Sequence, residues 1–151
     1  MDAASGEAAK EARVPTPYRD TEPLGDEECR RLLGAAGIGR VAFTLAALPA
    51  IGLVSYTVSD DVVMIPTRAG SDLSRAARGA VVAFQADSYD ALRHTGWSVT
   101  VVGPSQVLPA ERAADPEGCL VAIRMSVVRG LRGPLTRSGP DAGLSGRRTG
   151  P

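Results

Sequence analysis

The chain has 151 residues, a length that suits one folded domain. Its 17 basic side chains balance its 17 acidic ones, so the net charge gives no reason to expect nucleic acid or an anionic membrane as a partner. Hydrophobic residues make up 44% and aromatic residues only 4%, alongside 17 glycines and 11 prolines. We therefore expect an aliphatic core with many turns, rather than a helical bundle.

We expect neither a signal peptide nor a membrane span in this sequence. Residues 1–13 mix acidic and basic side chains without an apolar stretch, so we expect a cytoplasmic protein. The longest apolar stretch, Val41–Val54, is interrupted by a threonine and a proline and is shorter than the ~20 residues that a spanning helix needs. Cys29 and Cys119 do not make a disulfide framework, and we expect both thiols to be reduced.

Both ends of the chain have few apolar residues and no periodicity. Residues 1–23 are rich in Ala, Glu, Pro and Thr, and residues 134–151 in Gly, Pro, Ser and Arg, so we expect disordered tails at both ends. Residues 24–133 contain no internal repeat. They predict one compact domain.

An amphipathic helix is the first predicted element. Asp26 can cap its start, and Gly37 or Gly39 can end it. Apolar residues recur between them at helical spacing, at Cys29, Leu32, Leu33 and Ala36. The glycine-rich segment 34–39 follows a helix and precedes a strand, which is the reverse of the order in dinucleotide-binding motifs.

Six strands are predicted from runs of β-branched and aliphatic residues, at 39–45, 50–58, 62–65, 80–87, 96–103 and 120–125. The first two form an antiparallel hairpin. Its connection lacks Asn-Gly or Asp-Gly, so a longer or irregular loop is an open alternative. A short helix over 71–78, capped by Ser71, separates the third strand from the fourth. This order predicts a mostly β fold, an antiparallel barrel with short peripheral helices.

Metal-dependent and triad chemistry have little support. His94 is the only histidine, so several His or Cys ligands cannot be assembled within one chain. The acidic and serine residues near it in sequence carry no nucleophile-elbow motif. Axial ligation of haem by His94 remains a weaker alternative, because one imidazole can suffice.

The segment Pro66–Leu73 is a better candidate for an anion site. A predicted strand ends here in a threonine and an arginine, and a Gly-Ser pair opens the next helix, a combination that can hold a phosphate. Asp72 places a negative charge at the same point. An ordinary capped surface helix is therefore the alternative interpretation.

Six segments in succession resemble the pyridoxamine 5'-phosphate oxidase-like, FMN-binding split-barrel family, at 24–33, 38–43, 48–56, 69–73, 78–84 and 95–99. The resemblance covers nearly the whole predicted domain. It implies a six-stranded antiparallel split β-barrel that forms a homodimer, with two flavin sites in clefts between the subunits. This fold agrees with the order of elements predicted from the residue patterns.

The resemblance also implies which residues contact the flavin. In the family, the phosphate is held at the end of the third strand and the start of the next helix, where this chain has Thr67, Arg68 and Ser71. Residues at positions that line the isoalloxazine or the cleft between subunits are Ser55, Tyr56, Trp97 and Ser98. The chain departs from the family where Pro66 replaces the usual Arg and Asp72 replaces the usual Lys.

The function implied by this resemblance is a flavin-dependent oxidoreductase acting on a small organic substrate. FMN is the expected cofactor, and the deazaflavin F420 is less favoured. The flavin carries the redox chemistry, so no strong acid-base cluster is needed. Because two cations are missing from the phosphate site, the alternative is a degenerate site that binds a hydrophobic pathway intermediate without flavin.

Overall fold

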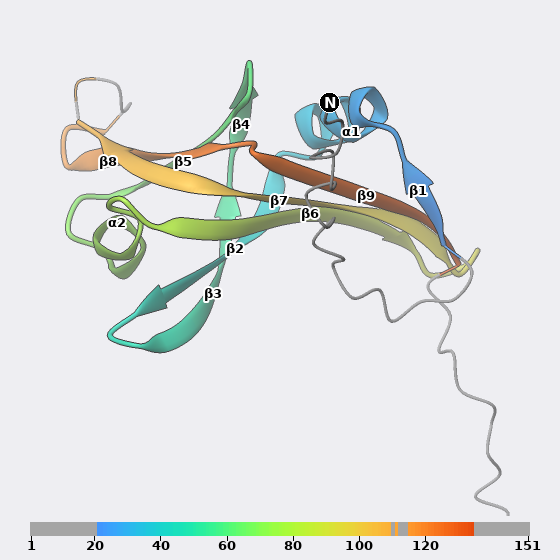
Figure 1. Ribbon diagram of the computed structural model, residues 1–151, viewed down its shortest axis with the longest axis horizontal. Coiled ribbons are helices and arrows are strands. Elements are labelled where there is room, and N and C mark those ends of the chain that lie inside the picture. The colour runs from blue at the N-terminus through green and yellow to red at the C-terminus, as the bar shows by residue number, and fades with distance from the viewer. Residues whose placement is uncertain (1–20, 110, 112–114, 135–151) are drawn as a thin grey trace, which may run out of the picture.

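The computed structural model describes residues 21–109, 111 and 115–134, and its strands form one curved sheet (Figure 1). The helices are α1 (Asp26–Ala36) and α2 (Asp72–Ala76). The strands are β1 (Glu22–Leu24), β2 (Ile38–Leu45), β3 (Leu48–Ser55), β4 (Thr57–Ser59), β5 (Val62–Arg68), β6 (Val81–Asp90), β7 (Thr95–Leu108), β8 (Gly118–Arg124) and β9 (Val127–Pro134).

Neighbouring strands follow the order β3-β2-β6-β7-β8-β5-β4, and β9 pairs with both β7 and β1. Each of these pairings is antiparallel. Strands β3 and β4 stand at the two ends of the path, so the sheet curls without closing. This confirms the mostly β, antiparallel split-barrel fold expected from the sequence.

The described residues form nine strands, three more than expected. The predicted strand 50–58 is two strands: β3 pairs with β2, whereas β4 pairs with β5. Between them, the backbone N–H of Tyr56 donates to the carbonyl of Gly37 at 3.1 Å and ends the first ladder. Strands β1 and β9 pair with each other and were not predicted, because Pro23 and two glycines weaken their patterns.

The predicted tails, residues 1–23 and 134–151, lie mostly outside the described residues. The exceptions are Thr21, the β1 residues Glu22 and Pro23, and Pro134 of β9. In the described part of the chain, neither helix has the length and apolar character needed to cross a membrane.

A tight turn joins β2 to β3. Leu45 pairs with Leu48, so only Ala46 and Ala47 form the connection, and both have positive φ, 49° and 63°. Positive φ at both central residues is typical of a type I′ turn, whose twist matches that of a β-hairpin. The longer loop that the sequence left open is therefore not formed.

The core lies between the inward faces of the central strands and the two helices. Its largest fully buried side chains on strands are Val41, Val63, Ile65, Phe84, Val99, Val101, Val121 and Ile123. Helix α1 packs mainly against β9 and β6, and α2 against β2, β5 and β8. As predicted, α1 buries Cys29, Leu32 and Leu33. Burial raises the pKa of the Cys29 thiol, and both cysteines are free.

A pair of ionic contacts joins the first helix to the last strand. Glu28 of α1 accepts hydrogen bonds from Arg31 at 2.7 Å and from Arg132 of β9 at 2.8 Å. These two guanidinium groups lower the pKa of Glu28 from its usual range to about 2. The contact with Arg132 therefore persists at mildly acidic pH.

Candidate functional site

A pair of hydroxyl groups lies where β5 turns into α2. The Oγ1 of Thr67 and the Oγ of Ser71 are 3.1 Å apart. The intervening chain makes a tight turn, in which the N–H of Ser71 donates to the carbonyl of Arg68 at 3.1 Å and Gly70 has φ of 78°. Ser71 also caps α2 as predicted, because its Oγ accepts the N–H of Ser74 at 3.2 Å. The turn thus brings together Thr67, Arg68 and Ser71.

Carboxylates offset two of the cations beside these hydroxyls. Arg68, whose side chain is 75% exposed, lies 3.7 Å from Glu117 in the segment before β8. Asp72 accepts a hydrogen bond from Arg75 at 3.1 Å, one turn further along α2. The local charge is therefore less positive than the arginines alone suggest.

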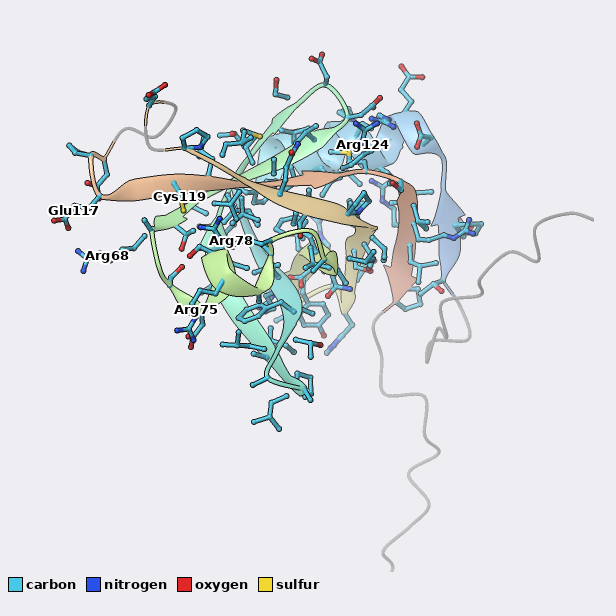
Figure 2. All side chains as sticks on the ribbon, turned by 60° about the vertical axis from the view of Figure 1, so that its left-hand side comes forward. Arg68, Arg75, Arg78, Glu117, Cys119 and Arg124 are labelled. Carbon is cyan, nitrogen blue, oxygen red and sulfur yellow. The ribbon has the colours of Figure 1, made fainter. Side chains whose placement is uncertain are left out.

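Arg78 is a cation that the sequence analysis did not assign to the site. It follows α2 and lines a cleft of about 370 Å³ with Ala69, Leu108, Gly118 and Cys119. Within the described part of the chain, Arg78 makes no hydrogen bond or ion pair. Figure 2 shows it with Arg68 and Arg75 around α2 and the end of β5. Its guanidinium is therefore available to an anion.

Ser55 and Tyr56 lie at the end of β3, where Ser55 is exposed and pairs with Ile38. The Tyr56 side chain is buried, and its hydroxyl donates to the carbonyl of Leu33 at 2.6 Å. Its ring meets that of Phe84 edge-on, with the centroids 4.6 Å apart. Burial raises the pKa of Tyr56. The hydroxyl is thus engaged inside the fold, and the flavin contacts of both residues remain predictions.

Trp97 and Ser98 lie near the start of β7. Trp97 pairs with Ser88 of β6 and Arg132 of β9, and the three residues border a cleft of about 240 Å³. Trp97 is seven residues from Pro104, which faces the start of β6 just after α2. At ~3.3 Å per residue, this separation is roughly 23 Å. The cleft that Trp97 borders contains neither Thr67 nor Ser71.

No described segment gathers three His, Cys, Asp or Glu side chains that could hold a metal ion. His94 is exposed in the connection between β6 and β7, has φ of 51°, and lies 3.4 Å from the hydroxyl of Tyr89. Its proposed role as a haem ligand remains untested.

Comparisons with known proteins agree with this fold. The sequence profile of the family described as pyridoxamine 5'-phosphate oxidase matches residues 25–137. The chain belongs to this family. It shares 39% identity over 135 residues with the uncharacterized protein Rv0080 of Mycobacterium tuberculosis, an alignment that covers 78% of this chain and 89% of that protein.

Two solved structures have a similar fold. An FAD-binding protein from Mycobacterium smegmatis is 27% identical, with a TM-score of 0.64, and the match covers 75% of this chain and 98% of that one. An FAD-binding protein from Mesorhizobium loti shares the fold at 19% identity, with a TM-score of 0.62, over 76% of this chain and 99% of that one.

The groups around α2 fit a phosphate, with fewer cations than the family pattern has. Two hydroxyls and the guanidinium groups of Arg68 and Arg78 can donate to phosphate oxygens. The carboxylates of Asp72 and Glu117 disfavour a phosphate that carries two negative charges. Pro66 supplies neither an N–H nor a charge. The site therefore suits a phosphate ester that is held mainly by hydrogen bonds.

Proposed function

We propose that this protein binds a flavin nucleotide whose phosphate is held by Thr67, Ser71, Arg68 and Arg78. The observation that carries the proposal is the 3.1 Å approach of the two hydroxyls at the start of α2. Arg78, which has no carboxylate partner among the described residues, follows the end of the same short helix. The 27% identical protein that binds FAD supports the flavin class. FMN is the form we expect, with F420 less favoured.

A flavin bound here supplies two-electron chemistry, which makes the protein an oxidoreductase acting on a small organic substrate. The chain's own residues bind and orient the cofactor. Thr67 and Ser71 donate hydrogen bonds to phosphate oxygens, and Arg78 neutralises charge. The tight turn at Gly70 brings the hydroxyls of Thr67 and Ser71 together at the end of β5.

A second copy of the chain completes the proposed site. The cleft that Trp97 borders contains neither Thr67 nor Ser71, so we expect Trp97 and Ser98 to contribute to a flavin cleft across a dimer. Exposed apolar side chains on the outer face of the sheet support this dimer. Ile51 and Leu53 of β3 and Val81 of β6 expose 75%, 70% and 70% of their surface there. Such apolar patches mark interaction surfaces.

A flavin-free split barrel is the second candidate function. The pairing of Arg68 with Glu117 and of Asp72 with Arg75 favours it, because both pairs reduce the attraction for phosphate. In that case the cleft between subunits holds a hydrophobic ligand.

The first experiment is to purify the protein without added cofactor, record its visible absorption spectrum, and identify any released chromophore by mass spectrometry. The proposal predicts a flavin spectrum, or flavin uptake on titration with FMN. A colourless protein that takes up none of FMN, FAD and F420 would contradict it and favour the flavin-free candidate.

Variants then test the placement of the phosphate. Arg78→Gln should weaken flavin binding by about tenfold or more, because it removes a charged hydrogen bond. Asp72→Asn should strengthen binding, because it removes the opposing charge. Arg93→Gln removes the same charge at the exposed connection between β6 and β7 and serves as the control. Equal affinities for Arg78→Gln and Arg93→Gln would exclude Arg78 from the site.

A further inference from the structure

Two arginines differ from the others in the described part of the chain. Carboxylates lie within ion-pair distance of most described arginines, namely Arg30, Arg31, Arg40, Arg68, Arg75, Arg93 and Arg132. Arg78 and Arg124 have no such contact among the described residues, and each of them lines a cleft. Arg78 belongs to the proposed flavin site, whereas Arg124 lines a larger cleft that shares Leu108 with the cleft at Arg78.

The cleft at Arg124 has a volume of about 640 Å³ and lies on the outer face of β5, β8 and β7. Strand β6 begins at Val81, opposite Pro104, so the part of β7 beyond Pro104 no longer has β6 beside it. There, β7 pairs with β8 instead of β9. The cleft is lined by this part of β7 together with residues of β8 and β5.

The sheet register places one charged and one amide side chain beside an apolar floor. Met64 of β5 pairs with Ala122 of β8, and Ala122 pairs with Gln106 of β7. Arg124 pairs with Val62 in the neighbouring row. Val62 and Met64 of β5 face outward, because they alternate with Val63 and Ile65, which are buried. The side chains paired with them on β8 lie on the same face. The cleft therefore combines an apolar surface with hydrogen-bond donors at its border.

The guanidinium of Arg124 forms no ion pair with the acidic side chains of the described residues near it. Asp60, in the turn between β4 and β5, also lines the cleft, but it forms no ion pair with Arg124. Its neighbour Asp61 is already paired with Arg30 of α1. Arg124 is thus the cleft's one basic group, and Asp60 its one acidic group, among the described lining residues.

We propose that this cleft binds a small organic carboxylate with an apolar body. Its carboxylate accepts hydrogen bonds from Arg124, whose planar guanidinium matches a carboxylate in a two-point contact. The apolar body covers Met64, Ala122 and Pro104. The volume is within the range of small-molecule sites. None of Thr67, Arg68, Ser71 and Arg78 lines this cleft, so its residues differ from those proposed to hold the flavin phosphate, although the two clefts share Leu108.

The test uses 2-naphthoate as the probe and its neutral analogue 2-naphthamide as the comparison. Both are titrated into the full-length protein carrying ¹³C-methyl methionine, and binding is followed by calorimetry and NMR. We expect 2-naphthoate to shift the Met64 methyl signal and to leave that of Met125 in place, because Met64 lines the cleft and Met125 is buried in the core. The amide should bind at least about tenfold more weakly.

Charge variants make the test specific. Arg124→Gln should weaken 2-naphthoate by about tenfold or more, whereas Asp60→Asn should leave its affinity unchanged or raise it. Arg93→Gln is the control for loss of a surface charge. Three outcomes would each overturn the proposal: no shift of Met64, equal binding of acid and amide, or unchanged affinity in Arg124→Gln. Circular dichroism confirms that each variant is folded.

Discussion

At the scale of single residues, Tyr56 shows how a side chain predicted to face a ligand can serve the core. Its hydroxyl reaches the carbonyl of Leu33 near the end of α1, and its ring packs edge-on against Phe84 of β6. The residue therefore connects the helix to the sheet. Because the Tyr56 hydroxyl already donates its hydrogen to Leu33, it can contact a flavin only as a hydrogen-bond acceptor.

Replacing Tyr56 by Phe separates these roles. Tyr56→Phe keeps the ring and removes a buried hydrogen bond, so it should lower the free energy of unfolding by about 1 kcal/mol, measured by urea denaturation. Tyr89→Phe is the control, because Tyr89 is exposed and its contact with His94 is long, at 3.4 Å. Weaker flavin binding in Tyr56→Phe, at unchanged unfolding free energy, would contradict the structural role.

The local parts of the candidate site could be predicted from the sequence, and the distant parts could not. Thr67, Arg68 and Ser71 lie within one turn, whose glycine and helix cap are visible in the residue pattern. Arg78 lines a cleft with Ala69 of this turn, because only the short helix α2 separates the two residues in the chain. The partners of Arg68 and Arg124 depend on strands distant in sequence, and no local pattern reports them.

At the scale of elements, β7 determines how the sheet bends. It pairs with β9 up to Val102 and with β8 from Ser105. Gly103 stands between these ladders, against the backbone of Arg124, and a Cβ built there would overlap the carbonyl oxygen of that residue. The hydroxyl of Ser105 then donates to the carbonyls of Ala77 and Ala80, at 2.8 and 2.9 Å, and holds the chain after α2 against β7.

Gly103→Ala tests this close approach. The added methyl must push the two strands apart, and we expect the free energy of unfolding to fall by about 3 kcal/mol or more. Gly52→Ala is a matched control in β3, where the nearest atom to a new Cβ is Val41 Cγ1 at an ordinary 3.8 Å. It should change stability by less than about 1 kcal/mol. Similar urea midpoints for the two variants would show that the strands do not approach closely at Gly103.

Element type was more predictable than element length. The predicted strands 39–45, 62–65 and 96–103 all lie inside observed strands. Strand β7 is much longer than expected, with 14 residues, because two successive partners extend its ladder. Residue pattern reflects burial on one face, whereas strand ends depend on the hydrogen-bonding partner. The division between β3 and β4 has the same cause.

At the scale of the whole molecule, the apolar outer face of β3, β2 and β6 is the main feature without a partner in the described chain. Leu53 pairs with Arg40, and Ile51 with Ala42, which in turn pairs with Ala83. The row of Ile51, Ala42 and Ala83 is apolar, whereas the row of Leu53 also holds Arg40, which is paired with Asp87, and Gln85, which donates to Thr100. Burying this face in a symmetric dimer would remove it from water and bring two flavin clefts together.

Leu53→Arg tests the dimer. A charge in the centre of this face should shift the protein from dimer to monomer, measured by size-exclusion chromatography with light scattering. The fold should persist, because Leu53 is 70% exposed in the single chain. Leu92→Arg provides the control, since Leu92 is 94% exposed in the connection between β6 and β7. A wild-type protein that is monomeric at tens of micromolar would contradict the proposed interface.

Because β1 pairs with β9, the N-terminal part of the fold can be completed only after the C-terminal strand has been synthesised. Strand β1 has β9 as its partner, with Glu22 opposite Arg132, and the buried face of α1 packs mainly against β9 and β6. While the chain is being translated, β1 and α1 leave the ribosome long before β9 exists. Cys29, Leu32 and Leu33 therefore remain without part of their final cover until the C-terminal strand has been made. A nascent chain that stops before Val127 presents an apolar helix to the chaperones around it.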